Sequence, residues 1–205
     1  MILQMLQDIF NLFERHKKSV EAEDFKIFGV PYDSQRDNKI DPNQTCFTTS
    51  LSMVIRYLEE HGQNRDLWLN DGVELYLTST VANNLTNFKK ILYEICNASG
   101  NPRYFGRFWT YFINQYCDGF SAEYKVFSLD QFKKFLFEEK IPVCVPTKLT
   151  SAGHIIVAKG YSSKGLYCHD PYGCYPYKDN LNGEDVFYLD DKFHKSFSAV
   201  VIRRK

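Results

Sequence analysis

The stretch that decides the fold is residues 41–58, DPNQTCFTTSLSMVIRYL. Its first part is polar and turn-forming, and apolar residues then recur at helical spacing from Leu51 to Leu58. Cys46 lies where the two parts meet. The free N–H groups and the dipole of a helix N-terminus stabilise a thiolate. The stretch therefore predicts a helix that begins near Cys46 and carries a reactive thiol, although a cysteine at a helix start is usually a small buried residue.

The chain after Cys46 changes from helical to strand periodicity near residue 140. Apolar and aromatic periodicity predicts helices over residues 88–95, 105–116 and 129–136, the last with Ser128 or Asp130 near its start. Apolar runs bounded by turn residues predict strands over residues 25–32, 141–147, 153–161, 166–170, 185–189 and 197–202. Helices followed by consecutive strands predict an α+β fold with an antiparallel sheet.

Residues 1–24 are predicted to form an amphipathic helix, with its apolar face in residues 2–13, and a charged connector. We expect this helix to pack on a domain formed by residues 25–205; a dimer contact or a membrane-surface contact is the alternative. It does not resemble a signal peptide, because its positive charges follow the apolar part. No apolar run reaches the roughly 18 residues that a membrane span needs. The expected location is the cytoplasm, with release by lysis or unusual secretion left open.

Charge and cysteine content narrow the function classes. Lys+Arg and Asp+Glu balance at 25 each, so the composition predicts no nucleic-acid partner. The six cysteines show neither Cys-x-x-Cys nor zinc-finger spacing, and we expect reduced thiols and no cofactor. A metal site formed by Cys168, His169, Asp170 and Cys174 is disfavoured, because neighbouring residues of a strand point to opposite faces.

A thiolate nucleophile also needs a base, and His154 is the preferred candidate among five histidines. It opens a predicted strand directly after Gly153, and the apolar run that follows would anchor it. Asp170 lies 16 residues later, across a predicted hairpin turn at residues 162–165. Two adjacent antiparallel strands could therefore place the carboxylate beside the imidazole.

Each of these residues also has a structural explanation. A histidine at a strand start is commonly a hydrogen-bonded structural residue, and Asp170 before Pro171 is typical of an Asx-turn. The combination of a helix-borne Cys46 with a sheet-borne histidine and aspartate favours the roles of nucleophile, base and orienting residue.

Four segments carry a resemblance to a known family: residues 30–38 (VPYDSQRDN), 45–54 (TCFTTSLSMV), 153–161 (GHIIVAKGY) and 169–173 (HDPYG). In these segments the chain resembles the peptidase C39-like family of papain-fold proteins, which includes bacteriocin-processing double-glycine peptidase domains. The resemblance implies a papain-like cysteine proteinase fold, with the nucleophile at a helix N-terminus packed on a C-terminal antiparallel sheet. It also implies a bacterial or phage protein.

The resemblance assigns a role to four residues. Cys46 matches the nucleophile of the family, His154 its general base and Asp170 its orienting residue. Gln35 matches the glutamine that helps to form the oxyanion hole. Gln44 is a rival for that role, but it lies only two residues before Cys46, so Gln35 is preferred.

The implied function is that of a cysteine peptidase, which cleaves amide bonds of a peptide or protein through a thioester acyl-enzyme. A cell-wall peptide amidase or endopeptidase, and a non-catalytic binding or effector module that retains the fold, are the alternatives. Phe47 departs from the family pattern, because many relatives carry glycine or a small polar residue after the cysteine. We expect this bulky side chain to shape or narrow the substrate cleft.

Overall fold

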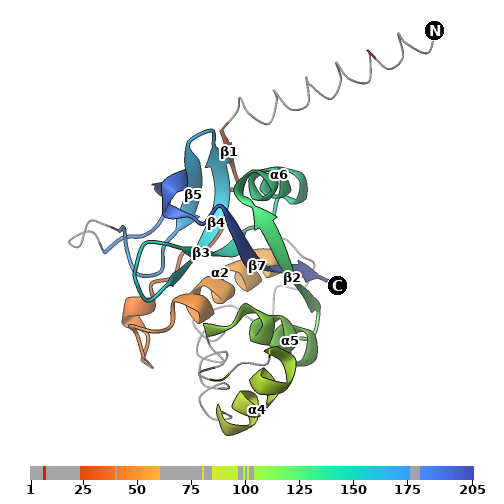
Figure 1. The fold of residues 1–205 in the computed structure, drawn as a ribbon. Helices are drawn as coiled ribbons and strands as arrows, with labels where there is room; N and C mark the ends of the chain where they lie inside the picture. The colour runs from red at the N-terminus through yellow and green to blue at the C-terminus, as the bar shows by residue number, and fades with distance from the viewer. Residues whose placement is uncertain are drawn as a thin grey trace.

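The structure is a computed structural model of the chain (Figure 1), and it describes residues 7, 24–39, 41–60, 80, 85–96, 99, 101, 104–175 and 181–205. Apart from Gln7, the helix predicted over residues 2–13 lies outside this part of the chain, and the domain boundary at residue 24 stays a prediction. Among the described residues, no helix has the length and apolar character that crossing a membrane requires.

The described helices all precede residue 140, apart from one short turn near the C-terminus. They are η1 (Gln35–Asp37), α2 (Cys46–Glu60), α4 (Leu85–Cys96), α5 (Gly106–Tyr116), α6 (Leu129–Glu139) and η3 (Asp190–Lys192). The described strands are β1 (Phe25–Lys26), β2 (Phe120–Ser128), β3 (Val143–Thr147), β4 (His154–Ser162), β5 (Gly165–His169), β6 (Val186–Leu189) and β7 (Ser196–Arg204).

The strands form one antiparallel sheet in the order β2-β7-β3-β4-β5-β6, and β1 pairs with the C-terminal end of β4. The predicted α+β fold with an antiparallel sheet is therefore confirmed. The sheet order does not follow the chain, because β7 lies between β2 and β3. The hairpin expected at residues 162–165 joins β4 to β5.

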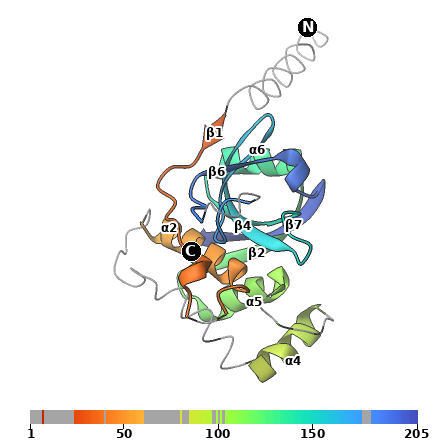
Figure 2. The ribbon, with the colours of Figure 1, turned by 90° about the vertical axis from the view of Figure 1, so that its left-hand side faces the viewer.

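Helices cover both faces of the sheet, as Figures 1 and 2 show for α6 on one side and for α2 and α5 on the other. The side-chain alternation of the central strands accounts for this arrangement. In β3, Cys144 belongs to the core that includes α2 and α5, whereas Val143 and Val145 belong to the core that includes α6. Each face is thus closed by an apolar layer, and α2, which carries Cys46, packs directly on the sheet.

One strand was not expected from the sequence. β2 lies between α5 and α6, so the predicted order of helices first and consecutive strands afterwards is wrong at this point. β2 pairs with β7 along its whole length, from Phe120 opposite Arg204 to Ser128 opposite Ser196. It forms an edge of the sheet and lies beside α5 (Figure 1).

The strand predicted over residues 25–32 is wrong beyond Lys26. Gly29 has a φ of 74°, which turns the chain away from an extended course, and Pro31 has no N–H to donate to a sheet. One further backbone bond, from the N–H of Ile27 to the carbonyl of Lys159 at 2.7 Å, follows β1. The chain then leads into η1, which carries Gln35.

Candidate active site

Cys46 is the first residue of α2 and is partly exposed. The N–H of Thr49 donates to the carbonyl of Thr45 at 2.9 Å, so helical hydrogen bonding starts directly before Cys46. The first N–H groups of an α-helix have no carbonyl partner within the helix, and they give this end partial positive charge. The sequence prediction of a cysteine at a helix start is therefore confirmed.

Polar side chains fix the position of this helix end. Asn38 Nδ2, from the loop after η1, donates to Thr45 Oγ1 at 2.7 Å. Ser50 Oγ, one turn into α2, donates to the carbonyl of Ile155 in β4 at 3.3 Å. These contacts join the start of α2 to a loop on one side and to the sheet on the other.

His154 is the first residue of β4 and pairs with Thr147 of β3. Thr147 Oγ1 donates to the carbonyl of His154 at 3.1 Å, which holds the backbone at this point. Gly153 before it has a φ of 83°, a conformation that glycine adopts without a steric penalty. The imidazole is 8% exposed, so its ring nitrogens find their partners within the protein.

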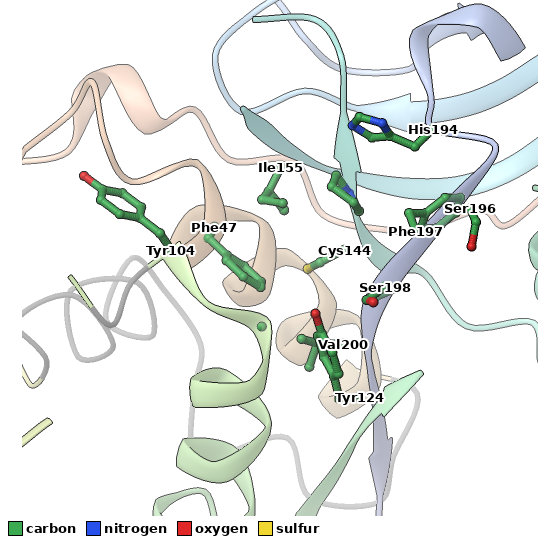
Figure 3. Close-up of a pocket in the computed structure, with 13 residues that line it drawn as sticks. Phe47, Tyr104, Tyr124, Cys144, Ile155, His194, Ser196, Phe197, Ser198 and Val200 are labelled. Atoms are coloured by element: carbon green, nitrogen blue, oxygen red, sulfur yellow. The ribbon is translucent and has the colours of Figure 1, made fainter. Parts of the chain in front are cut away.

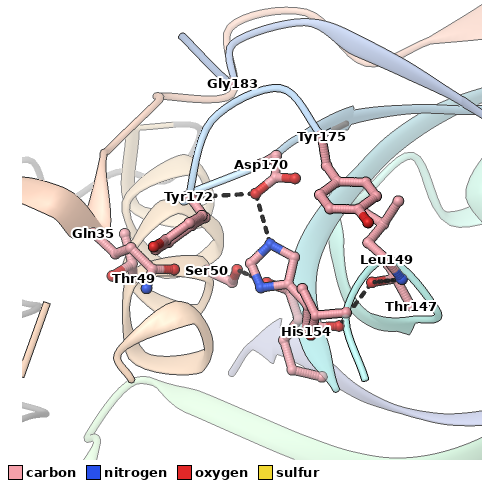
Figure 4. A network of polar contacts seen from close by, with 12 residues as sticks. Gln35, Thr49, Ser50, Thr147, Leu149, His154, Asp170, Tyr172, Tyr175 and Gly183 are labelled. Atoms are coloured by element: carbon pink, nitrogen blue, oxygen red, sulfur yellow. Dashed lines mark hydrogen bonds and ion pairs between the residues drawn. The ribbon is translucent and has the colours of Figure 1, made fainter. Parts of the chain in front are cut away.

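The imidazole of His154 lies between Asp170 and the Cys46 thiol. Its Nε2 lies 2.7 Å from Asp170 Oδ1 (Figure 4), and the ring is close enough to Cys46 for the thiol to raise the pKa of the imidazole. Because the carboxylate occupies Nε2, Nδ1 is the ring nitrogen that is left for the thiol. The three side chains thus form one chain of polar contacts that runs from a helix N-terminus to the sheet.

Opposing effects set the pKa of His154. Burial lowers this pKa, but the hydrogen bonds to Asp170 and Cys46 outweigh burial and raise it to about 9. The imidazole is therefore protonated near neutral pH, even though it is almost fully buried.

Asp170 is 1% exposed, and donors surround its carboxylate. Oδ1 accepts the N–H of Tyr172 at 2.9 Å in addition to its contact with His154, and Oδ2 accepts the hydroxyl of Tyr188 at 2.7 Å. The bond from Tyr172 closes the Asx-turn that is typical of an aspartate before a proline. The Asx-turn and the histidine contact therefore coexist on one carboxylate and are not alternatives.

Two residues that hold Asp170 were not identified from the sequence. Tyr188 of β6 is buried, and its hydroxyl also accepts the N–H of Tyr175 at 2.9 Å. The carbonyl of Gly183 accepts the N–H of Asp170 at 2.8 Å. A Cβ at position 183 would lie only 1.8 Å from the carbonyl oxygen of Asp170, so this close approach requires glycine.

Gln35 is 1% exposed and lies between the turn after Asp170 and the segment that leads into α2. Its backbone N–H donates to the carbonyl of Pro171 at 2.8 Å, and its Nε2 donates to the carbonyl of Pro42 at 2.7 Å. Its Oε1 accepts no hydrogen bond from the described residues. A side-chain amide carries two N–H groups, so one donor remains on Nε2 beyond the bond to Pro42.

Asp33 links the segment before η1 to α2. Its carboxylate contacts Arg56 Nη1 at 2.6 Å through Oδ1 and accepts the hydroxyl of Ser52 at 3.2 Å through Oδ2. Both partners lie on α2 behind Cys46. This contact holds the segment that carries Gln35 to the helix that carries Cys46.

Gln44, the rival of Gln35, has a different environment. It is exposed, and its Oε1 accepts a hydrogen bond from the hydroxyl of Tyr104. Its backbone N–H donates to the carbonyl of Asp41 at 2.8 Å within the turn before α2. The structure therefore places Gln44 in a contact with the α5 side of the molecule, and it places the buried Gln35 next to the Asp170 turn.

A pocket of about 310 Å³ adjoins the site (Figure 3). Phe47 and Ile155, which directly follow Cys46 and His154 in the chain, form part of its wall. Cys144 lies in the same wall and is close enough to Cys46 for the two thiols to interact electrostatically. The side chain of Phe47, which departs from the family pattern, therefore shapes the space beside the thiol.

The residues considered for a metal site do not come together as ligands. His169 Nε2 lies 2.9 Å from the carbonyl of Val30, and Nδ1 accepts the N–H of Asp185 at 3.0 Å. Both ring nitrogens are thus used within the protein. No group of three or more potential metal ligands occurs in the described part of the chain.

Four other cysteines lack the environment of Cys46. Like Cys46, they are free thiols, and Cys117, Cys144 and Cys168 are buried, whereas Cys174 is partly exposed. Burial raises the pKa of Cys117 to about 11 and also raises the pKa values of Cys144, Cys168 and Cys174. A raised pKa leaves less of the reactive thiolate at neutral pH.

Comparisons with known proteins agree with this fold. A protein of known crystal structure from Bacillus anthracis, described as a candidate C39-like peptidase, is 17% identical to the chain with a TM-score of 0.51. The match covers 89% of this chain and 100% of that one. A search among curated proteins found no match. The model of the Peptidase C39-like family matches residues 27–188, more than half of the chain, and the chain therefore belongs to that family.

Proposed function

We propose that the protein is a papain-like cysteine peptidase with Cys46 as the nucleophile, His154 as the general base and Asp170 as the orienting residue. The observation that carries this proposal is the continuous contact from the Cys46 thiol through the imidazole to the buried carboxylate. Nucleophile, base and orienting group in mutual hydrogen-bond contact are the arrangement that thiol hydrolases require. Membership of the Peptidase C39-like family supports the same class.

The reaction would begin with a proton on the imidazole. His154 holds the proton that leaves Cys46, and the resulting imidazolium and the helix N-terminus stabilise the thiolate. The sulfur attacks the carbonyl carbon of a peptide bond, and the carbonyl electron pair moves to the oxygen. The Cys46 backbone N–H and the remaining Gln35 Nε2–H would donate to this oxyanion.

The tetrahedral intermediate then collapses to a thioester. The C–N bond breaks as His154 Nδ1 delivers its proton to the leaving amine. The imidazole next takes a proton from water, whose oxygen attacks the thioester carbon. Collapse of this second intermediate breaks the C–S bond and releases the carboxylic acid. The sulfur leaves as a thiolate beside the imidazole that took the proton from water, so that the starting ion pair is restored.

Asp170 would act through the imidazole and not on the substrate. Its contact with Nε2 fixes the ring so that Nδ1 faces the sulfur, and its negative charge stabilises the imidazolium. The donors from Tyr172 and Tyr188 hold the carboxylate in this orientation. The base is thus positioned by a buried carboxylate, whose bonds to His154 and Tyr188 are themselves buried.

A direct test compares peptide hydrolysis by the full chain and by two cysteine variants. Wild-type protein is incubated with a peptide mixture of varied sequence, including cell-wall peptides, and new termini are identified by mass spectrometry. Cys46→Ala is expected to abolish cleavage, and Cys174→Ala, which removes another partly exposed thiol, is expected to retain it. Cleavage that survives in Cys46→Ala would contradict the assignment of Cys46 as the nucleophile, and the absence of cleavage by wild-type protein would support the non-catalytic module instead.

A further inference from the structure

The pocket beside Cys46 has a floor without charge. Cys144 of β3 and Val200 of β7 are each 2% exposed and line its inner part. None of the described residues that line it has an Asp, Glu, Lys or Arg side chain. A charged group that entered this space would lose its water without gaining an ionic partner, which is costly.

Aromatic side chains form the walls. Phe47 lies on the α2 side, and Tyr104 and Tyr124 come from the segment before α5 and from β2 (Figure 3). Phe47 is held against Trp109 of α5, with ring centroids 6.0 Å apart. The walls therefore present ring faces and edges, which pack well against another ring or an aliphatic chain.

The width of the pocket depends on Gly106, the first residue of α5. A Cβ at this position would lie 2.7 Å from the Tyr124 ring and 3.2 Å from Val200. The missing side chain lets the Tyr124 ring pack against the start of α5. α5 therefore closes one side of the pocket without filling it.

Polar groups occur at the outer end. His194, Ser196 and Ser198 line this end, on the side opposite Tyr104 and Phe47 in Figure 3. His194 and Ser196 are exposed, and Ser198 is partly buried. The pocket thus leads from an apolar floor near the thiol to a polar rim at the surface, the usual composition of a ligand pocket.

We propose that this pocket receives a large uncharged side chain, aromatic or long aliphatic, of the substrate residue next to the scissile bond. The proposal rests on the proposed function, because the scissile bond is placed by Cys46. At about 310 Å³ the pocket has room for any single apolar side chain. A glycine at this substrate position would leave the pocket unused, and a lysine or glutamate would bring an unpaired charge into it.

Binding to the Cys46→Ala protein tests the proposal without any turnover. Five blocked alanine-based pentapeptides that differ only in the central residue (Phe, Leu, Gly, Lys or Glu) are titrated by calorimetry. The Phe and Leu peptides are expected to bind at least about tenfold more tightly than the other three, because single apolar groups discriminate by 10-fold or more. Equal affinities for all five peptides would overturn the proposal.

Two substitutions at Ser198, made in the Cys46→Ala protein, assign the preference to this pocket. Ser198→Trp fills the space and should remove the advantage of the Phe peptide, whereas Ser198→Asp adds a carboxylate and should favour the Lys peptide. Leu189→Trp, at an exposed position of β6 on the opposite edge of the sheet, is the matched control and should leave the order unchanged. An unaltered order of peptide affinities in both Ser198 variants would contradict the proposal. If Ser198→Trp does not fold, the order of peptide affinities in Ser198→Asp alone tests the proposal.

The outcomes separate this proposal from the proposed function. Selective binding by a protein whose Cys46 cleaves nothing would leave the pocket assignment standing and would remove the peptidase. Cleavage by wild-type protein without selectivity for the central residue would leave the peptidase standing and would remove the pocket assignment.

Discussion

The hydroxyl of Tyr188 donates a hydrogen bond of 2.7 Å to Asp170 Oδ2, on the oxygen that His154 does not contact. Both residues are buried, and the same hydroxyl accepts the N–H of Tyr175. The carboxylate is therefore held at both oxygens, and its plane is fixed relative to the imidazole. Tyr188 is a positioning residue in the proposed mechanism, because it acts on the base only through Asp170.

Tyr188→Phe is predicted to lower kcat/KM by about tenfold or more, because a hydrogen bond to a charged group contributes about 1.5–3 kcal/mol. The loss should fall on kcat, since the substrate contacts are unchanged. Steady-state kinetics with a peptide substrate measures kcat and KM. Thermal melting measures whether the substitution also lowers the stability of the fold. Tyr167→Phe is the control, because its hydroxyl bonds to the distant Asp24 at 2.9 Å. Equal kinetics in both variants would show that Asp170 needs no support from β6.

Gln35→Ala is predicted to lower kcat by about 10²–10³-fold, the usual loss for one oxyanion donor. Gln44→Ala should change kcat little, because its side chain bonds to Tyr104 and is exposed. Single-turnover kinetics with the two variants measures this difference. If Gln44→Ala lowers kcat more than Gln35→Ala does, Gln44 and not Gln35 is the side chain that donates to the oxyanion.

The activity is predicted to fall on the alkaline side as His154 loses its proton. The pKa of His154 is raised to about 9 from the ordinary value of 6.5, so the protonated ring is retained through neutral pH. The contribution of the protonated His154 ring to the stability of the protein is fully present below pH 6.5 and is lost as pH rises through about 9. Asp170→Asn removes the carboxylate that raises this pKa, so the alkaline limb of kcat/KM should move to lower pH. A pH profile with the same limb in both proteins would contradict the assignment of His154.

His169 is predicted to destabilise the protein in acid. Burial, followed by the charge of Lys159, lowers the pKa of His169 to about 4. The unfolded chain takes up a proton near pH 6.5 and the folded chain does not, so stability falls as pH falls from 6.5 to 4, by up to about 1.4 kcal/mol per pH unit. His169→Asn should flatten this slope in denaturant titrations and lower stability at pH 7.5, since two hydrogen bonds are lost. His194→Asn, at an exposed position, should keep the original slope.

Local sequence patterns predicted the parts of the fold that local forces determine. The change from turn residues to helical periodicity placed the start of α2 at Cys46, and Ser128 forms the capping box of α6 with Gln131. The turn after Ser162 made a hairpin of β4 and β5, and this hairpin brings His154 to Asp170.

The parts that were missed depend on distant contacts. Apolar and polar residues alternate from Phe120 to Val126, a signal for β2, but this alternation does not match the burial. Phe120 belongs to the core that includes α5 and Phe127 to the core that includes α6, whereas Val126 is 65% exposed. The four residues of β6 are all apolar or aromatic, so nothing in the sequence separates the inward Tyr188 from the outward Phe187. Gly183 contacts Asp170 across a loop whose length gives no indication of that approach.

The pocket likewise could not be predicted from the sequence. Phe47 was expected to shape the cleft as a departure from the family pattern, and it does form one wall. The other walls come from Tyr104 and from α5, β2, β3, β4 and β7. They lie 57 or more positions after Phe47 in the chain (104 − 47 = 57). Their meeting depends on the insertion of β7 between β2 and β3.

The most direct test of the central claim is the rate at which iodoacetamide alkylates Cys46 at pH 7, resolved by site with mass spectrometry. Because the pKa of His154 is raised to about 9 and its protonated ring lies close to the thiol, Cys46 should react at least about tenfold faster than Cys174. This difference in alkylation rate between Cys46 and Cys174 should disappear in His154→Ala. Equal rates for Cys46 and Cys174 in the wild-type protein, or an unchanged Cys46 rate in His154→Ala, would contradict the account.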